Sequence, residues 1–401
     1  MNDMNRKILI VTPYYYPDIA SSVKLMKELA EFLSDYFDVV VYTNEIRKKD
    51  TYFRGSKQEE NRIRLVRVRN CFVRLPGLLA KVFEYIVFSI KLVIYIRKRR
   101  NLFNTIFCQS NPPLLTIPIR IAAGKQAKVI FNVQDLFPNS LVPYFGSHNY
   151  YFLRKCEKIA YNWSDIVTTI SQDFAKWIRS ISNTTVKIIP NWINTAEISF
   201  VEQQRNNVYS SIDSIIKQKP IIVYSGNIGI NQDFDTVLEV SKMSEDLNFV
   251  IIGSGKKKKD LKIKITKCGI NNIFLLEPFP SEKIPEVYSF ADIYLLPMRK
   301  NAMIASYPSK AWSILACGST LVASLDVNSG FAREMTTNQL AYVCEPENAT
   351  ELLRVIRIAL EENSNNARVR QYRMEYVRKN YDIMIAMQNY LDLMQQIADY
   401  N

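Results

Sequence analysis

The chain alternates short apolar runs with stretches of helical spacing, and this alternation constrains its fold more than any other feature. The apolar run at 7–12 is followed by apolar residues three or four positions apart within 22–34, and then by a second apolar run at 39–43. Continuous apolar runs of this length are typical of strands buried on both faces, and a helix between two of them predicts a parallel βαβ unit. The sequence therefore predicts an α/β fold with parallel sheets.

The alternation occurs in two successive series, which predicts two domains. The further apolar runs lie at 105–108, 129–133, 166–170, 186–189, 221–226, 249–253, 273–276, 293–296 and 320–324. Residues 191–219 between the two series are polar and poor in strands, as expected of an interdomain connection. We expect Rossmann-like domains at 1–190 and 191–375 that face each other across a cleft, and a C-terminal helix at 376–401 that packs back on the first domain.

Composition excludes several classes of protein. Hydrophobic residues make up 48% and charged residues 23% of the 401 residues, which is typical of a folded globular chain. The six cysteines lie far apart without a C-x-x-C pair, so neither a zinc site nor a disulfide framework is predicted. The N-terminus runs into an apolar strand without the apolar region and cleavage site of a signal peptide, so we expect a cytoplasmic protein.

Two glycine-bearing turns predict where a ligand binds. Ser225-Gly226-Asn227 ends the first strand of the second series, and Gly253-Ser254-Gly255 ends the next strand. Ligands of open α/β sheets bind beyond the carboxyl ends of the strands, where glycine lets the backbone approach a phosphate closely. Each turn alone also fits a purely geometric role.

A third feature adds a cation. Tyr307-Pro308-Ser309-Lys310 precedes an apolar helical stretch that Gly318 closes. A serine cap followed by a lysine in the first helical turn places unpaired amides and an ammonium at one point, which suits a diphosphate. The alternative is an ordinary capped helix with a solvated lysine.

Taken in order, these features resemble the donor domain of retaining glycosyltransferases of family 4, which have the GT-B fold. The run 291–297, Ala-Asp-Ile-Tyr-Leu-Leu-Pro, belongs to the same ordered set, and the segments 12–17 and 133–138 fit the acceptor domain of that family. The branch that the chain resembles most is that of bacterial surface-polysaccharide transferases, which includes fucosamine transferases.

The resemblance implies a reaction and a set of site residues. A sugar would pass from a nucleotide-diphosphate donor, expected to be a UDP-sugar, to a saccharide on polyprenyl diphosphate, with retention of configuration and without a metal or other cofactor. The product would be capsule, O-antigen of lipopolysaccharide, or exopolysaccharide.

The implied donor contacts are Gly226, Asn227, Gly253, Gly255, Ser309 and Lys310. The implied acceptor contacts are Tyr15, Ser21, Ser22 and Asp135, with Asp135 and Lys310 as the catalytic residues. Stabilisation of the departing diphosphate by Lys310 agrees with chemistry that needs no metal.

The chain departs from the family pattern at several positions. Ala305 and Ser313 occupy the positions of two glutamates that many members carry with the spacing E-x7-E. Asn231-Gln232 replaces a frequent Lys-Gly pair, and Ser21-Ser22 replaces a glycine pair near the N-terminus. These differences leave the donor sugar open.

Two titratable residues outside the donor domain are candidates for a catalytic role. Asp135 follows an apolar strand, and we expect its carboxylate to contact the acceptor hydroxyl; a turn or helix-cap aspartate is the equally weighted alternative. His148, the only histidine, lies in a polar Gly-Ser-His-Asn context that is typical of an exposed loop.

Residues 78–96 form a long apolar segment, and the region around it is basic. Between residues 61 and 100 there are eleven Lys or Arg and one acid, Glu84. The charges within the segment argue against a membrane-spanning helix and favour a helix lying at the surface of the inner membrane face. The residues expected to contact that anionic surface are Lys81, Phe88, Lys91, Arg97, Lys98, Arg99 and Arg100. The alternative is a buried Rossmann helix whose ends are basic.

Two other functions fit parts of the pattern. A sugar-nucleotide epimerase of the same fold needs positioned acid and base side chains, which the scarcity of histidine and the missing acid pair disfavour. A noncatalytic membrane or nucleic-acid binding protein could use the basic stretch. Nucleic-acid binding is disfavoured because that stretch is interleaved with aliphatic residues rather than with stacking aromatic residues.

Overall fold

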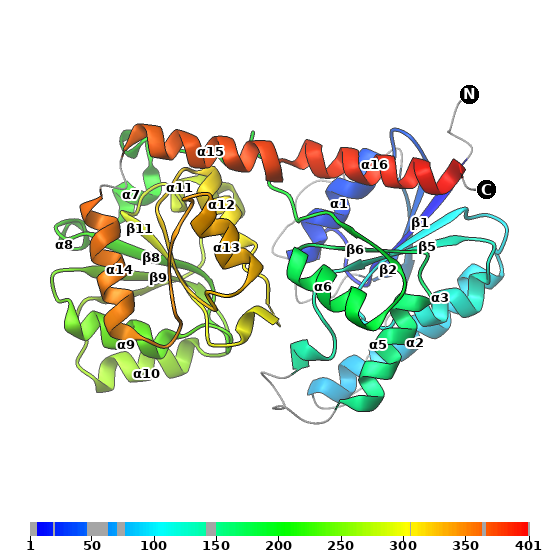
Figure 1. Cartoon of the computed structure of the whole chain (residues 1–401), viewed down its shortest axis with the longest axis horizontal. Helices are drawn as coiled ribbons and strands as arrows, with labels where there is room; N and C mark the ends of the chain where they lie inside the picture. Colours follow the sequence, from blue (N-terminus) through cyan, green and yellow to red (C-terminus); the bar gives the residue numbers. More distant parts are fainter. Residues whose placement is uncertain are drawn as a thin grey trace. The chain divides into compact units, whose positions relative to one another are not determined.

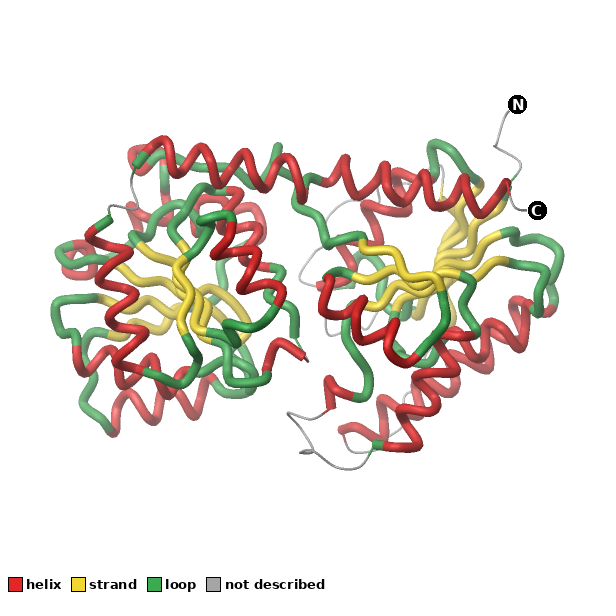
Figure 2. The backbone as a smooth tube through the Cα atoms, viewed as in Figure 1, coloured by secondary structure: helices red, strands yellow, loops and turns green. Residues whose placement is uncertain are grey.

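The computed structural model describes residues 6–18, 21–45, 63–69, 77–141, 150–304, 306–362 and 366–399. The chain divides into two compact units (Figure 1). The first contains Met1–Pro138, His148–Asn191 and Ala386–Asn401, and the second contains Asn139–Ser147 and Trp192–Ile385. Each unit is built around its own sheet, with helices on both faces (Figure 2). The predicted pair of Rossmann-like α/β domains is confirmed.

In the described residues, the first unit has a sheet of seven parallel strands in the order β3-β2-β1-β4-β5-β6-β7. The strands are β1 (Lys7–Val11), β2 (Asp38–Asn44), β3 (Ile63–Val68), β4 (Thr105–Gln109), β5 (Lys128–Val133), β6 (Ile166–Thr169) and β7 (Thr185–Ile188). The helices are α1 (Ser21–Leu33), α2 (Gly77–Arg97), α3 (Thr116–Ala123), α5 (Tyr151–Asn162), α6 (Gln172–Ile181) and α16 (Ile383–Asp399). In Figure 1, α1 and α16 lie on one side of this sheet, and α2, α3 and α5 lie on the other.

The second unit repeats this plan over the residues that are described there. Six parallel strands follow the order β10-β9-β8-β11-β12-β13. They are β8 (Ile221–Asn227), β9 (Asn248–Ser254), β10 (Ile273–Leu276), β11 (Ile293–Pro297), β12 (Leu321–Ser324) and β13 (Tyr342–Cys344). The helices are α7 (Asn207–Ser211), α8 (Ser214–Lys217), α9 (Phe234–Met243), α10 (Lys258–Lys267), α11 (Ile284–Val287), α12 (Lys310–Ala316), α13 (Gly330–Thr337), α14 (Ala349–Glu361) and α15 (Ala367–Tyr381). Buried side chains of α9, α10 and α14 pack on one face of the sheet, and those of α11, α12 and α13 pack on the other.

Two strands lie where no apolar run predicted one. β3 has the sequence Ile-Arg-Leu-Val-Arg-Val, in which two arginines interrupt the apolar pattern, and it lies at the edge of its sheet beside β2. β13 has only three residues and lies at the edge of the second sheet. Edge strands are partly solvated, so they do not need the continuous apolar sequence of an interior strand.

The C-terminal segment consists of two helices rather than one. α15 ends at Tyr381 and packs against α12 in the second unit, whereas α16 belongs to the first unit from Ala386 onward. The hydroxyl oxygen of Tyr390 on α16 accepts a hydrogen bond of 3.0 Å from Nδ2 of Asn132 at the end of β5. A C-terminal helix that packs on the first domain is thus confirmed for α16, while the predicted start at residue 376 falls inside α15.

Candidate functional site

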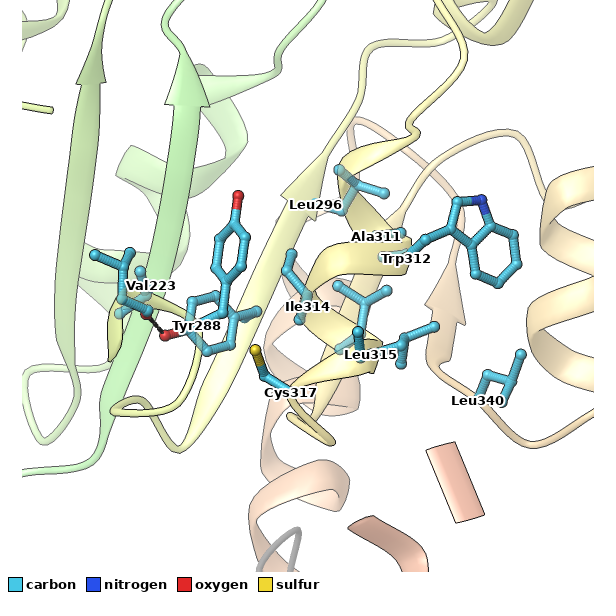
Figure 3. Packing of buried hydrophobic residues seen from close by; sticks show 14 of the residues in the cluster. Val223, Tyr288, Leu296, Ala311, Trp312, Ile314, Leu315, Cys317 and Leu340 are labelled. Carbon is cyan, nitrogen blue, oxygen red and sulfur yellow. Dashed lines mark hydrogen bonds between the residues drawn. The ribbon is translucent and has the colours of Figure 1, made fainter. Parts of the chain in front are cut away.

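Lys310 begins α12, a helix that is fixed in the core of the second unit. Its side chains Ala311, Ile314 and Leu315 are buried in a cluster with Val223 of β8 and Leu296 of β11 (Figure 3). On the next helix face, Trp312 stacks on Tyr381 of α15 with ring centroids 3.6 Å apart. Packing on both sides fixes the axis of α12, and this determines where the side chain of Lys310 can reach.

The ammonium of Lys310 points to the turn at the end of β8. Its Nζ donates a hydrogen bond of 2.7 Å to the carbonyl oxygen of Ser225. Burial lowers the pKa of Lys310 from its ordinary 10.5 to about 8, so the side chain is still mostly charged at neutral pH. Among the residues described, no carboxylate forms an ion pair with it. A largely desolvated ammonium that has only a neutral oxygen as partner is favourable only when an anion completes its environment.

Of the glycines predicted to contact the donor, Gly226 lies beside this ammonium, and Gly253 and Gly255 lie against the turn that contains Gly226. A Cβ atom on Gly226 would come within 2.3 Å of Lys310 Nζ, and a Cβ on Gly253 would come within 1.9 Å of the carbonyl oxygen of Gly226. A Cβ on Gly255 would come within 2.3 Å of the carbonyl oxygen of Ile228 and 2.7 Å of Asn227 Oδ1. The two turns therefore touch through backbone atoms, and a side chain at Gly253 or Gly255 would separate them, whereas a side chain at Gly226 would displace the ammonium of Lys310.

Ser309 does not cap α12 as the sequence suggested. It occupies the position before the helix, but its backbone is helical, with φ −55° and ψ −23°, and its side chain accepts no capping hydrogen bond. A capping serine needs an extended backbone, and the turn after Pro308 instead continues directly into the helix, with the Ala311 amide donating to the Pro308 carbonyl at 3.1 Å. The predicted serine cap is wrong, whereas the predicted cation is in place.

The residues that replace the family pattern have structural partners where they are described. Gln232 Oε1 accepts a hydrogen bond of 3.1 Å from the Gly229 amide, and the Asn231 carbonyl accepts one of 2.9 Å from the Arg299 amide. Ser313 lies on α12 and is half-buried. Ala305, like His148, lies outside the described residues.

A pocket of about 410 Å³ lies beside these turns, and the sequence did not predict it. Its lining includes Gly229, Gln232, Lys257, Lys264 and Arg299, and none of the six predicted donor residues. Its cations already have partners, because Arg299 and Lys264 both pair with Asp235 and Lys257 pairs with Asp260. We regard Lys310, which pairs with no carboxylate in the part of the chain that is described, as the centre of the candidate site rather than this pocket.

On the first unit, Asp135 follows β5 at the carboxyl edge of the sheet. The residue is exposed at its surface, yet partial burial raises the pKa of its carboxyl group to about 6. Tyr15 is fully buried, so its side chain is part of the core. Ser22 is half-buried in the first turn of α1, and the side chain of Ser21 lies outside the described atoms. Asp135 is therefore the predicted acceptor residue with the clearest access to a ligand.

Comparison with known proteins decides the family. The model of glycosyltransferase family 4 matches residues 23–197, and the model of glycosyl transferases group 1 matches residues 209–376. The two matches together cover both units. The chain belongs to the family 4 glycosyltransferases.

Relatives of this family 4 glycosyltransferase are similar over part or all of its length. The putative colanic acid biosynthesis glycosyl transferase WcaI of Escherichia coli K12 is 28% identical over 213 residues, which is 52% of either chain. Sucrose-phosphate synthase of Thermosynechococcus elongatus has the same fold, with a TM-score of 0.81, 14% identity and 99% of this chain and 100% of that chain covered. Anabaena HepE in complex with UDP-glucose also shares it, with a TM-score of 0.70, 14% identity and 97% and 99% covered. The predicted GT-B architecture is confirmed.

In this family 4 glycosyltransferase, the residues predicted to contact a membrane differ in exposure and fall into three groups. Lys81, Arg97, Lys98 and Arg100 are exposed. Phe88 is only 2% exposed and packs against Tyr42 with ring centroids 5.3 Å apart, so its prediction as a contact residue is wrong. The remaining two are half-buried, and each has a partner within the protein: Lys91 Nζ donates to the Arg69 carbonyl at 2.5 Å, and Arg99 lies over the ring of Tyr95. Lys91 and Arg99 thus contact the protein itself, whereas Lys81 is exposed.

The outward face of α2 is apolar instead. It presents side chains at intervals of three or four residues, of which Ile86, Ile90 and Ile94 are 51%, 55% and 50% exposed and Val82 and Phe83 add to the same stripe. α3 contacts both α2 and α5. α5 exposes Tyr151, Phe152 and Ile159, with Phe152 73% exposed. We call these exposed residues of α2 and α5 the apolar face. None of the helices within the described ranges is long and apolar enough to cross a membrane.

Proposed function

We propose that this protein transfers a sugar from a UDP-sugar to a lipid-linked saccharide during synthesis of a bacterial surface polysaccharide, with retention of configuration. The observation that carries the donor half is the partly buried ammonium of Lys310, which donates to the Ser225 carbonyl at the end of β8 and pairs with no carboxylate of the described residues. A diphosphate supplies the missing anion. UDP-glucose bound to HepE, which has the same fold, supports a uridine nucleotide as the donor.

The proposed role of Lys310 is to stabilise the leaving group. As the bond between the sugar and the diphosphate breaks, negative charge develops on the diphosphate oxygen. An ammonium held in a poorly solvated site stabilises that charge more than one in water does, and it does so without reorganisation. The protonated lysine would thereby serve where other enzymes use a divalent cation, so we propose that no metal is needed.

The proposed role of Asp135 is to contact the acceptor hydroxyl. Its carboxyl group lies at the carboxyl edge of the first sheet, where ligands of α/β folds bind. A pKa of about 6 means that the carboxylate is ionised at neutral pH yet basic enough to accept a strong hydrogen bond from a hydroxyl group.

A lipid-linked acceptor is supported by the position of the apolar face. α2 reaches the same carboxyl edge, because Tyr85 Oη donates to Asn111 Oδ1 beyond β4 at 2.6 Å and Lys91 Nζ donates to the Arg69 carbonyl beyond β3. Apolar side chains that would rest on lipid thus begin next to the edge at which the acceptor sugar would bind.

Basic residues around the apolar face support an anionic membrane surface as its partner. Lys81 and Arg97 on α2, Lys98 and Arg100 in the turn after it, and Lys155 and Lys158 on α5 are exposed. Each basic residue near an anionic surface contributes about 1 kcal/mol to membrane binding, and the apolar side chains add the hydrophobic part. We propose a peripheral location on the inner face of the cell membrane.

A panel of nucleotides tests the donor half of the proposal. UDP, GDP, ADP and CMP are added to the purified protein, and the shift in Tm is measured, because a ligand that binds the native state stabilises it by mass action. We expect UDP to raise Tm more than the other nucleotides do. The panel is then repeated with Lys242→Met as a control, since Lys242 is an exposed lysine at the far end of α9. No shift with any nucleotide would refute the proposed function.

A further inference from the structure

A buried polar network lies at the end of β5, directly before Asp135. Asn132 is fully buried, and its Nδ2 donates to Thr168 Oγ1 and to the hydroxyl oxygen of Tyr390, both at 3.0 Å. Its Oδ1 accepts a hydrogen bond of 2.7 Å from Gln134 Nε2. Gln134 Oε1 in turn accepts one of 2.8 Å from Asn191 Nδ2. Each side-chain polar group of Asn132 is therefore paired, as buried polar groups generally are.

The two outer members of this network lie where the chain passes from one unit to the other. The first unit ends at Asn191, and it resumes at Ala386, four residues before Tyr390. Within the second unit the two connecting segments are hydrogen-bonded to each other. The Ile193 amide donates to the Tyr381 carbonyl at 2.8 Å, and the Ile383 amide donates to the Ile193 carbonyl at 2.9 Å. Both chain connections are therefore attached to the end of the same strand.

Gln134 transmits this attachment to the next residue. Its side chain is held at both ends by Asn132 and Asn191, and its backbone amide donates to Ser110 Oγ at 3.0 Å. With the side chain and the amide both fixed, the backbone torsions that lead into Asp135 have little freedom. Asn132 and Gln134 are thus placed to set the direction of the Asp135 side chain. Tyr390 and Asn191 in turn hold the side chains of Asn132 and Gln134.

We propose that Tyr390 and Asn191 are positioning residues, which act through Asn132 and Gln134 to hold the Asp135 carboxylate in its reactive orientation. The inference rests on the proposed function, since it assigns Asp135 a role at the acceptor. A carboxylate displaced by a fraction of an ångström loses alignment with its hydroxyl partner, so loosening the network lowers turnover without changing how the donor binds.

The test compares Tyr390→Phe with a matched control, Tyr161→Phe. Tyr161 lies in the same unit, is buried, and donates through its hydroxyl to Glu157 Oε1 at 2.9 Å, so both substitutions remove one buried, hydrogen-bonded phenol hydroxyl. Asn191→Ala, at a less buried position, provides a second variant if Tyr390→Phe folds poorly. Transfer is assayed with UDP-glucose and a polyprenyl diphosphate-linked N-acetylglucosamine in vesicles. In parallel, the titration of Asp135 is followed by NMR of protein labelled with ¹³C at aspartate carboxyl groups and assigned through Asp135→Asn.

We expect kcat to fall roughly tenfold in Tyr390→Phe and Asn191→Ala while KM for UDP-glucose stays within about twofold. In these variants the pKa of Asp135, taken from the midpoint of the NMR titration, falls by roughly half a pH unit or more toward the ordinary aspartate value, because a loosened carboxylate is better solvated. Tyr161→Phe changes neither quantity. If both network variants retain the wild-type kcat and midpoint, the positioning role is refuted. If no nucleotide stabilises the wild-type protein, the proposed function fails instead, and the NMR midpoint still decides whether the network holds Asp135.

Discussion

Lys310 on α12 donates through Nζ to the carbonyl oxygen of Ser225 at the end of β8, across 2.7 Å. These residues are 85 positions apart in the sequence and come together because β8 and β11 are neighbours in the sheet and α12 follows β11. The contact brings a cation to the turn where an open α/β sheet binds its ligand. Nucleotide binding in this family 4 glycosyltransferase should therefore depend on the charge of Lys310.

UDP affinity should fall as the pH rises through about 8. In the free protein, burial lowers the pKa of Lys310 to about 8, and a bound diphosphate raises it again by favouring the charged form. Binding at pH 8.5 must therefore take up a proton, whereas at pH 7 the lysine is already charged. Calorimetry in two buffers of different ionisation enthalpy measures this uptake. If the observed enthalpy of UDP binding at pH 8.5 is the same in both buffers, no proton is taken up and Lys310 does not contact the diphosphate.

Gly253→Ala should destabilise the second unit and abolish nucleotide binding. The new Cβ would lie 1.9 Å from the Gly226 carbonyl oxygen, so the two turns must separate, and we expect a loss of about 3 kcal/mol in the free energy of unfolding. Gly269→Ala is the matched control, because a Cβ there meets no atom within 4 Å and only the positive φ of 63° opposes it, which costs about 1 kcal/mol. Urea denaturation measures both. Equal losses in the two variants would contradict the close approach of the turns.

Asp135→Asn should lower turnover without lowering stability. The pKa of Asp135 is raised to about 6 in the folded protein, so the folded state holds its proton more tightly than the unfolded state does. Stability is therefore lost as pH rises from the ordinary aspartate pKa to about 6, and at pH 7.5 the neutral amide removes this disadvantage. We expect the kcat/KM of the wild-type protein to rise as the pH increases through about 6. In the variant this rise should be absent. A variant with wild-type turnover would remove Asp135 from the site.

The double variant Ile86→Glu/Ile90→Glu should bind vesicles poorly. Both side chains are more than half exposed on α2, so the protein still folds, but two carboxylates replace apolar contacts and repel anionic lipid. We expect binding to phosphatidylglycerol vesicles to fall roughly tenfold or more in a flotation assay. Ile215→Glu, on α8 of the second unit and 66% exposed, should bind like the wild-type protein. Equal flotation of all three proteins would contradict the role of the apolar face.

The sequence predicted the interior strands and the donor turns well, because both depend on local pattern. A strand buried on both faces must be apolar throughout, and position 253 must be glycine because two backbones approach each other there. Both requirements restrict the local sequence and can be recognised in it. That Lys310 lies near the glycine-bearing turns was predicted through the order of the motifs, whereas its hydrogen bond to the Ser225 carbonyl was not predicted.

Other features could not be predicted because they depend on how elements pack. In α2, Phe88 and Lys91 were expected to face a membrane. Instead, Phe88 and Tyr95 pack against Tyr42, and this turns the isoleucines to the surface. The cap assigned to Ser309 failed because the chain after Pro308 is already helical. The network of Asn132 joins residues 258 positions apart and has no local pattern at all.

Calorimetric titration of UDP into the wild-type protein and Lys310→Met at pH 7 tests the central claim most directly. Methionine keeps the apolar stem of the lysine and removes the ammonium, so folding is retained, while a charge-assisted contact worth about 2 kcal/mol is lost. We predict that the Kd for UDP rises roughly thirtyfold and that the proton uptake at pH 8.5 disappears. An unchanged Kd in a folded Lys310→Met protein would contradict the claim that this lysine holds the diphosphate.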